Sequence, residues 1–180
     1  ENPIVIPSFT RRRLPFLFRS LEFKVGAEIG VAGGRQSLRF CRTISDIKFI
    51  CVDAWEKYEY DRKGRSCRHQ MNHESNYEMA QRRLAPYDVT FMKMDSMEAV
   101  KQIPEESLDF VYIDANHYYD YVKNDLIEWG KRIRKGGVIS GHDYFISPNC
   151  DVIQATKDYT IQNKISPWFI TDESSASYLW

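Results

Sequence analysis

The chain has 180 residues, 43% of them hydrophobic and 28% charged, which is the composition of one globular domain and not of a disordered or fibrous chain. Lysine plus arginine equals aspartate plus glutamate, at 25 each, so nucleic acid is not expected as a partner. No stretch reaches the roughly 18–20 apolar residues of a membrane span. Four cysteines without C-x-x-C spacing support neither a zinc site nor a disulfide framework, which favours a reducing, cytoplasmic setting.

Short apolar runs rich in β-branched and aromatic residues alternate with longer amphipathic stretches, as in parallel sheets covered by helices on both faces. The expected strands are Lys24–Ile29, Lys48–Val52, Val89–Met94, Leu108–Ile113, Gly137–Ser140, Pro167–Thr171 and Ser177–Trp180. The last two are separated by so short a turn that they must be antiparallel. The pattern predicts a Rossmann-like, doubly wound α/β fold: a three-layer α/β/α domain whose mostly parallel, seven-stranded sheet has one antiparallel edge strand.

Helices are expected between these strands. Their ranges are 34–43, 73–84, 97–102, 119–134 and 151–162. The fourth carries an apolar stripe at three- and four-residue spacing that ends with Trp129 and Ile133, followed by basic residues and Gly136. The polar segment 58–70 is interpreted as a long loop or lid, and the three arginines at 11–13 as a solvated face.

A glycine-rich turn, EIGVAGGRQS, closes the first strand and opens the first helix. Gly30 and Gly34 allow a close approach of the backbone to a ligand, and the helix N-terminus behind them favours polar or anionic groups. Counting G-x-G-x-x-G from Gly30 places Ala32 and Arg35 at the second and third glycines, so two of three positions fail and NAD or FAD is disfavoured.

Acidic residues follow the second and third strands. Asp53 is suited to accept hydrogen bonds from both hydroxyls of a ribose, and its alternative is a solvated turn aspartate. Trp55 is expected to cover a cofactor or to belong to the core. Asp95 with the adjoining backbone of Ser96 could reach an adenine amino group; Asp95 could equally be the N-cap of the next helix, and both interpretations can hold together.

The densest group of polar residues follows two adjacent strands, with Asp114 and His117 after one and His142 and Asp143 after the other. Carboxyl ends of neighbouring parallel strands converge, so these side chains should meet. Asp114, His142 and Asp143 could hold a divalent cation, with oxygen ligands suiting magnesium and histidine admitting manganese or iron. The structural alternative is that Asp114 only orients a cofactor and His142 only supports its neighbours.

With these residues in view, the chain resembles class I S-adenosylmethionine-dependent methyltransferases, and more narrowly the bacterial branch that includes macrocin-type sugar O-methyltransferases. The matching stretches run from GAEIGVAGGRQS through YIDANHYYDYVKNDL and GGVISGHDY to WFITDESSASYLW, over about residues 24–180. Residues 1–23 are then an N-terminal extension and 24–180 the methyltransferase domain. The resemblance implies that the cofactor site is lined by Glu28, Gly30, Ser37, Asp53, Asp95 and Asp114. In metal-dependent members, magnesium is held at the positions matching Asp114, His142 and Asp143, where the histidine departs from the usual pattern.

The resemblance implies transfer of a methyl group from S-adenosylmethionine to a small-molecule hydroxyl, sugar or phenol-like, with metal assistance left open. Because the donor is already activated, the protein must position the acceptor and remove its proton. His117 with Asp114 is the predicted catalytic pair, since an imidazole suits a base. Two other classes stay open, a non-catalytic S-adenosylmethionine-binding protein and a nicotinamide oxidoreductase, and so does a homo-oligomer.

Overall fold

The computed structural model describes residues 2–56 and 72–180. Its strands are β1 (Ile4–Ile6), β2 (Val25–Ile29), β3 (Lys48–Asp53), β4 (Val89–Lys93), β5 (Leu108–Ile113), β6 (Ile133–Tyr144), β7 (Phe169–Thr171) and β8 (Ala176–Leu179). Its helices are α1 (Leu14–Ser20), α2 (Arg35–Thr43), α3 (His73–Leu84), α4 (Ser96–Ala99), α5 (Tyr119–Gly130) and α6 (Val152–Gln162), with short 3-10 turns η1 (Arg11–Arg13) and η2 (Val100–Gln102). The expected lid at 58–70 lies outside the described residues.

All eight of these strands form one sheet in the order β1-β7-β8-β6-β5-β2-β3-β4. Every neighbouring pair is parallel except the two pairs that include β8. The expected α/β class and the antiparallel pair at the C-terminus are therefore confirmed. The expectation of seven strands was wrong by one: the N-terminal extension contributes β1, which pairs with β7. The antiparallel strand β8 lies between β7 and β6, inside the sheet and not at its edge as expected.

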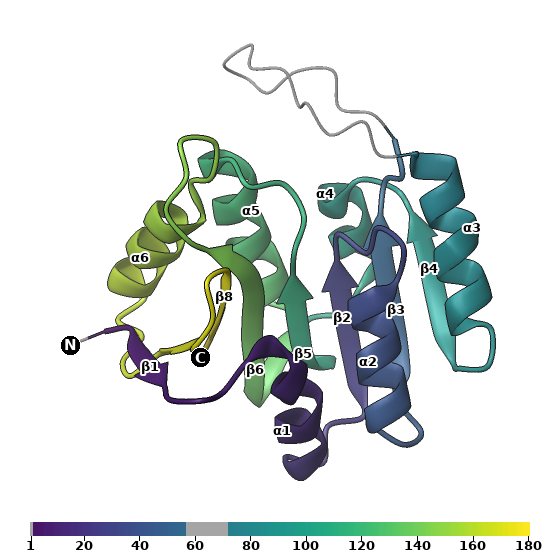
Figure 1. The fold of residues 1–180 in the computed structure, drawn as a ribbon, viewed down its shortest axis with the longest axis horizontal. Helices are drawn as coiled ribbons and strands as arrows, with labels where there is room; N and C mark the ends of the chain where they lie inside the picture. The colour runs from purple at the N-terminus through teal and green to yellow at the C-terminus, as the bar shows by residue number, and fades with distance from the viewer. Residues whose placement is uncertain (1, 57–71) are drawn as a thin grey trace.

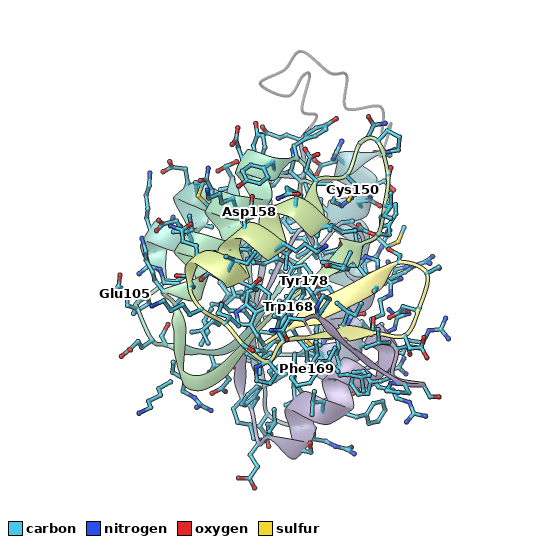
Figure 2. The ribbon with its side chains drawn as sticks, turned by 90° about the vertical axis from the view of Figure 1, so that its left-hand side faces the viewer. Glu105, Cys150, Asp158, Trp168, Phe169 and Tyr178 are labelled. Atoms are coloured by element: carbon cyan, nitrogen blue, oxygen red, sulfur yellow. The ribbon has the colours of Figure 1, made fainter. Side chains whose placement is uncertain are left out.

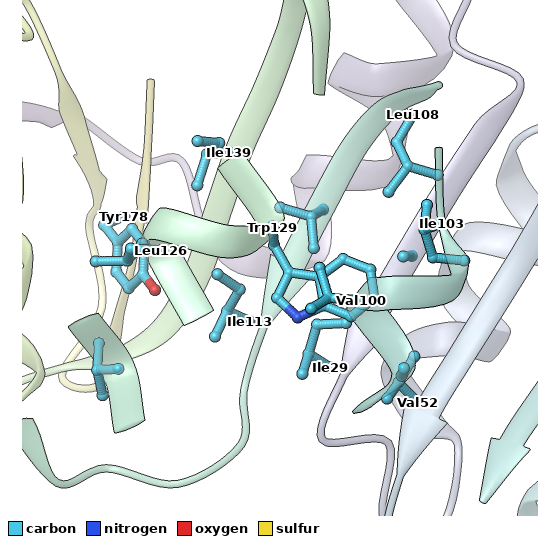
Figure 3. Close-up of a cluster of buried hydrophobic side chains, with 14 of the residues drawn as sticks. Ile29, Val52, Val100, Ile103, Leu108, Ile113, Leu126, Trp129, Ile139 and Tyr178 are labelled. Carbon is cyan, nitrogen blue, oxygen red and sulfur yellow. The ribbon is translucent and has the colours of Figure 1, made fainter. Parts of the chain in front are cut away.

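Helices cover both faces of the sheet and give three layers (Figure 1). On one face, α1, α2 and α3 bury a cluster that includes Phe18, Phe40 and Leu84. On the other face, α4, α5 and α6 bury a second cluster around Trp129, which Figure 3 shows beside Ile29 and Val100. Burial on both faces explains why the central strands read as continuous apolar runs in the sequence.

Helix α5 ends at Gly130, four residues before the expected end at Arg134, which corrects that boundary. Ile133 belongs to β6 and pairs with Leu108 of β5. Arg134 donates to Asp109 of β5 at 2.6 Å and so does not interact with the helix terminus. The helix ends here because the residues that follow form backbone hydrogen bonds with β5. Another turn of helix would prevent those bonds.

The C-terminal strands pack under α6. Trp168 and Tyr178 lie in the cluster on this face (Figure 2) and are 2% and 1% exposed. Tyr178 stacks on Trp180 with ring centroids 5.5 Å apart. None of the helices within 2–56 and 72–180 combines the length and apolar character needed to cross a bilayer. The two clusters thus fix the carboxyl ends of β2, β3, β5 and β6 along one edge, where the polar residues gather.

Candidate active site

The first loop is held tightly against β5. Glu28 is 2% exposed and its carboxylate accepts a hydrogen bond from the Ser37 hydroxyl. Burial raises the pKa of Glu28 well above its usual value, and Asp114 and Asp53 add to the rise. Gly30 has φ of +89°, and a Cβ there would lie 2.1 Å from the carbonyl oxygen of Asp114. Only glycine satisfies both demands, so the glycine couples the end of β2 to the end of β5.

Gly34, with φ of +73°, is the N-cap of α2. A Cβ at this position would lie 3.1 Å from the Cα of Ala80 in α3. Its role visible in the structure is thus the close approach of α2 to α3. Whether this glycine also contacts a ligand remains a prediction.

Asp53 ties the loop to the end of β3. Its two carboxylate oxygens accept the backbone N–H groups of Ala32 and Trp55, at 2.8 and 2.7 Å. Trp55 is 3% exposed, donates its indole N–H to the Ala32 carbonyl at 2.9 Å and packs on Tyr77. The structure therefore supports the core alternative for Trp55 and corrects the expectation that this ring covers a cofactor. Asp53 retains lone pairs for a ligand, since each carboxylate oxygen can accept more than one hydrogen bond.

A pocket of about 290 Å³ opens between α4 and α5. Its lining comprises Asp95, Ser96, Met97, Ala115, Asn116, Asp120, Tyr121, Asn124 and Asp125. Asp95 is the N-cap of α4 and accepts the Met97 N–H at 2.8 Å, as one of the two interpretations predicted. Asp95 also lines the pocket, so the other interpretation, that it contacts an adenine amino group, is compatible with this geometry.

Sequence reasoning missed Asp125, a buried carboxyl on the wall of this pocket. It accepts a hydrogen bond from the Ser96 hydroxyl, which in turn accepts the indole N–H of Trp129 at 2.8 Å. Burial raises the pKa of Asp125 to about 7. The sequence did contain a sign that Asp125 is buried. It lies three residues after Val122 and four before Trp129, and so falls on the apolar stripe of α5. The single O–H of Ser96 is therefore already used in the hydrogen bond to Asp125.

The ends of β5 and β6 carry a second cluster, centred on Asp143. His117 Nε2 lies 2.8 Å from Asp143 Oδ2, and His142 Nδ1 lies 3.0 Å from Asp143 Oδ1 and 3.6 Å from Asp114 Oδ1. The Ser175 hydroxyl, from the turn before β8, donates to Asp143 Oδ1 at 2.6 Å. The four residues predicted to converge at these strand ends therefore do so.

The cluster shifts its own pKa values. Burial acts against ionisation of Asp143, but hydrogen bonds from His117, His142 and Ser175 hold the pKa of that carboxyl well below its usual value. The hydrogen bond to Asp143 raises the pKa of His117, and burial only partly offsets it. Burial lowers the pKa of His142, yet Asp114 and Asp143 together raise it to about 9.

The structure groups possible metal ligands differently from the sequence. One ligand atom from each of Asp114, His117 and Asp143 lies within 4.8 Å of the others. His142, which was the predicted third ligand, has its Nε2 edge 3.0 Å from the Arg11 guanidinium. Its Nδ1 lies 3.0 Å from Asp143 Oδ1 and 3.6 Å from Asp114 Oδ1, so the ring contacts both carboxylates although it lies outside this group of possible ligands. Two carboxylates and the imidazole of His117 are the donor set that fits a divalent ion here.

Arg11 comes from the N-terminal segment, which runs from β1 across one face of the sheet to α1 (Figure 1). The segment is anchored by the pairing of β1 with β7 and by a hydrogen bond from the Arg11 N–H to Glu173 at 2.5 Å. Arg11 is half-buried, which corrects the expectation of a solvated face at this first arginine, although Arg12 and Arg13 are exposed. No local pattern signalled its partner, because His142 is 131 residues away in the chain.

The fold and the strand-end residues define an α/β domain of the Rossmann type with a pocket of about 290 Å³ at the carboxyl edge of its sheet. A family model described as "Methyltransferase domain" matches residues 27–144. The match spans most of the chain and includes every strand end described above, and the chain belongs to this methyltransferase family.

Solved structures of similar fold support the same architecture. The O-methyltransferase TomG from Streptomyces achromogenes, in complex with S-adenosylmethionine, is 17% identical, with a TM-score of 0.66 over 97% of this chain and 82% of that one. An O-methyltransferase from Bacillus cereus in complex with S-adenosylhomocysteine is 16% identical, with a TM-score of 0.64 over 94% and 78%. A putative O-methyltransferase from Klebsiella pneumoniae is 17% identical, with a TM-score of 0.66 over 94% and 77%. No curated protein matches the chain.

Proposed function

We propose that this protein transfers the methyl group of S-adenosylmethionine to the hydroxyl oxygen of a small molecule, sugar or phenol-like. The observation that carries the proposal is the adjacency of two unlike clusters at one edge of the sheet. A carboxylate group, Glu28 with Asp53 and Asp114, lies beside the first loop, and a base bound to a carboxylate, His117 with Asp143, lies beside Asp114.

The carboxylate group suits the cofactor. Glu28, Asp53 and Asp114 lie close enough that the latter two raise the pKa of Glu28 in addition to burial. The carboxylates of Asp53 and Asp114 favour a cationic ligand, and S-adenosylmethionine carries both an ammonium and a sulfonium. The 290 Å³ pocket adjoins Asp114 through Ala115 and has room for the flat base. The TomG and Bacillus cereus proteins, which have the same fold, were solved with S-adenosylmethionine and S-adenosylhomocysteine.

His117 is suited to receive the proton of the acceptor. Its Nε2–H donates to Asp143, which leaves the Nδ1 lone pair available to a hydroxyl. When the acceptor oxygen forms its bond to the methyl carbon, the carbon–sulfur bond breaks and the hydroxyl proton passes to His117 Nδ1. Asp143 fixes the tautomer and stabilises the resulting imidazolium, so it is a positioning residue. Bound S-adenosylmethionine supplies the activated methyl group, and the protein supplies orientation and proton removal.

A metal-assisted form is the second candidate, favoured by the short separation of ligand atoms on Asp114, His117 and Asp143. A divalent ion there would lower the pKa of the acceptor hydroxyl. His117 would then be a ligand and could not also be the base. Treating the enzyme with EDTA separates the two forms: the metal-free mechanism predicts unchanged turnover, and the metal-assisted one predicts its loss and its return with Mg²⁺ or Mn²⁺.

The proposal is tested by incubating the protein with S-adenosylmethionine and a panel of sugars and phenols, and measuring S-adenosylhomocysteine by mass spectrometry. Wild type should release it, whereas His117→Ala should release it about 100-fold more slowly with unchanged cofactor affinity. Equal turnover by His117→Ala would remove it as the base. Cofactor binding without product from any acceptor would favour a binding protein, and tighter binding of NAD in a parallel titration would favour an oxidoreductase.

A further inference from the structure

Two residues beside the first loop have a backbone conformation that residues with a side chain rarely adopt. Ala32, in the loop between β2 and α2, has φ of +45°, and Trp55, two residues after β3, has φ of +47°. Left-handed backbone is unfavourable for any residue with a Cβ, and most of all for bulky residues such as tryptophan. Such conformations persist only where the surrounding structure holds them, and they occur most often at binding and catalytic sites.

The two residues hold each other through Asp53. Its carboxylate accepts the backbone N–H of both, at 2.8 Å from Ala32 and 2.7 Å from Trp55. The indole N–H of Trp55 in turn donates to the Ala32 carbonyl at 2.9 Å. Both polar groups of the Ala32 backbone are therefore bound by side chains from the end of β3, which fixes the orientation of the peptide groups on either side of this residue.

Helix α3 holds the next residue of the loop. Arg83 donates a hydrogen bond from Nη1 to the carbonyl of Gly33, which lies 50 residues earlier in the chain. Tyr77 of the same helix packs on Trp55, with ring centroids 4.6 Å apart, and Trp55 is 3% exposed. Because the indole is packed in this way, it cannot turn away from Ala32 without disturbing its neighbours. The loop is thus held from two elements, the end of β3 and α3.

We propose that Trp55 and Arg83 are positioning residues that hold the first loop in the conformation that binds S-adenosylmethionine. Neither side chain touches the cofactor, since each acts through a loop carbonyl. The inference rests on the proposed function for the identity of the ligand. Asp53 links the two, because the carboxylate assigned to the ribose is also the acceptor of the Ala32 N–H.

The loss of either donor should let Ala32 relax from its left-handed conformation. Only a fraction of the molecules would then keep the loop in its binding conformation, and the apparent affinity for the cofactor falls by that fraction.

The test measures S-adenosylmethionine binding by calorimetry in two variants. Trp55→Phe keeps an aromatic ring against Tyr77 but lacks the indole N–H, and Arg83→Met keeps the length of the side chain but lacks its donors. Each should weaken binding about tenfold. Arg83→Lys, which restores a donor, should bind more tightly than Arg83→Met. The matched control, Arg82→Met, removes the exposed arginine that precedes Arg83 in α3 and should bind as wild type does.

A double variant separates positioning from a general loss of structure. Adding Ala32→Gly to Trp55→Phe removes the Cβ that disfavours left-handed backbone, so more molecules should regain the binding conformation of the loop. About threefold of the lost affinity should return. This gain must exceed the gain from Ala32→Gly alone in wild type, where the loop is already held.

The proposal is overturned if either Trp55→Phe or Arg83→Met binds S-adenosylmethionine as wild type does, or if Ala32→Gly recovers no affinity in Trp55→Phe. If thermal unfolding shows that Trp55→Phe is not folded, Arg83→Met takes its place in the double variant.

If wild type binds no S-adenosylmethionine, the proposed function fails. Amide hydrogen exchange of the ligand-free protein then decides whether Trp55 holds the loop. The peptide covering residues 30–34 should exchange about tenfold faster in Trp55→Phe than in wild type, and equal rates would overturn that role.

Discussion

The two halves of the sheet's carboxyl edge are built in different ways. In the half proposed to bind the cofactor (the cofactor half), at the ends of β2, β3 and β4, Asp53 and Asp95 accept hydrogen bonds from the backbone of their own or the adjacent loop. In the half proposed to bind the acceptor (the acceptor half), at the ends of β5 and β6, Asp143 is bound by side chains from three separate segments, His117, His142 and Ser175. Asp53 and Asp95 are thus positioned by backbone groups, whereas the position of Asp143 depends on the side chains of its partners.

This contrast gives different expectations for substitutions. A carboxylate held by backbone N–H groups is positioned by the fold, so its loss should mainly weaken a ligand. A carboxylate held by imidazoles positions those imidazoles in turn, so its loss should mainly impair proton transfer. Four variants test the comparison, from the largest expected free-energy effect to the smallest.

Asp125 of α5, which is hydrogen-bonded to Ser96 after β4, should make stability depend on pH. Its pKa is about 7 in the native protein and near 3.8 when unfolded, so the native state holds a proton that the unfolded state has lost between these values. Stability of wild type should therefore fall, relative to Asp125→Asn, by up to about 4 kcal/mol as the pH rises from 4 to 7, and the difference should stay level above 7. Urea unfolding of the ligand-free protein measures this, with Asp120→Asn as an exposed control from the same pocket. A difference that does not change with pH would contradict it.

Gly30 couples the two halves, because its added Cβ would lie 2.1 Å from the Asp114 carbonyl oxygen. Gly30→Ala should lower the free energy of unfolding by about 3 kcal/mol, from the left-handed backbone and the forced displacement together. The matched control is Gly136→Ala, which also has positive φ but has open space, with Arg134 the nearest atom at 3.6 Å. Chemical denaturation should show a loss of only about 1–2 kcal/mol in this control. Equal losses would mean that the contact with β5 does not matter.

Asp143→Ala tests the acceptor half. Removing the carboxylate leaves His117 without the group that orients it, so kcat should fall about 100-fold. The dissociation constant of S-adenosylmethionine should stay within twofold, since the cofactor half is untouched. Steady-state kinetics and calorimetry separate the two effects. Ser175→Ala, which removes only one hydrogen bond to Asp143, should have a far smaller effect on kcat, and a large effect there would argue that the turn before β8 holds the site.

Asp53→Ala is the reverse experiment and has the smallest expected effect. It should weaken S-adenosylmethionine binding about tenfold through the lost charged hydrogen bonds to ribose, with kcat at saturation nearly unchanged. If the calorimetric affinity for S-adenosylmethionine is unchanged, Asp53 does not belong to the cofactor site. Its role is then to hold the backbone N–H groups of Ala32 and Trp55.

Much of the fold was predictable, because it rests on local patterns. Strands β2 to β5 and the helix His73–Leu84 were expected to within one residue at each end, since apolar runs and amphipathic periodicity are read directly from the sequence. The structure corrects β6, which extends four residues beyond the expected Gly137–Ser140 at each end. The errors lie where a distant partner overrides a local preference. Ile133 continues the apolar stripe of α5 but pairs with β5, and residues 4–6 became a strand only because β7 offered an edge.

The sequence by itself determined the class of the protein and the strand ends at which its chemistry gathers, because strand-to-loop transitions and their carboxylates are local features. It also determined that the first loop is not a dinucleotide fingerprint. The tertiary structure alone decided which side chains touch. It grouped His117 with Asp114 and Asp143 as possible ligands, buried Trp55 in the core, and brought Arg11 to His142 across 131 residues. Such contacts depend on how both faces of the sheet are packed, and no spacing along the chain encodes them.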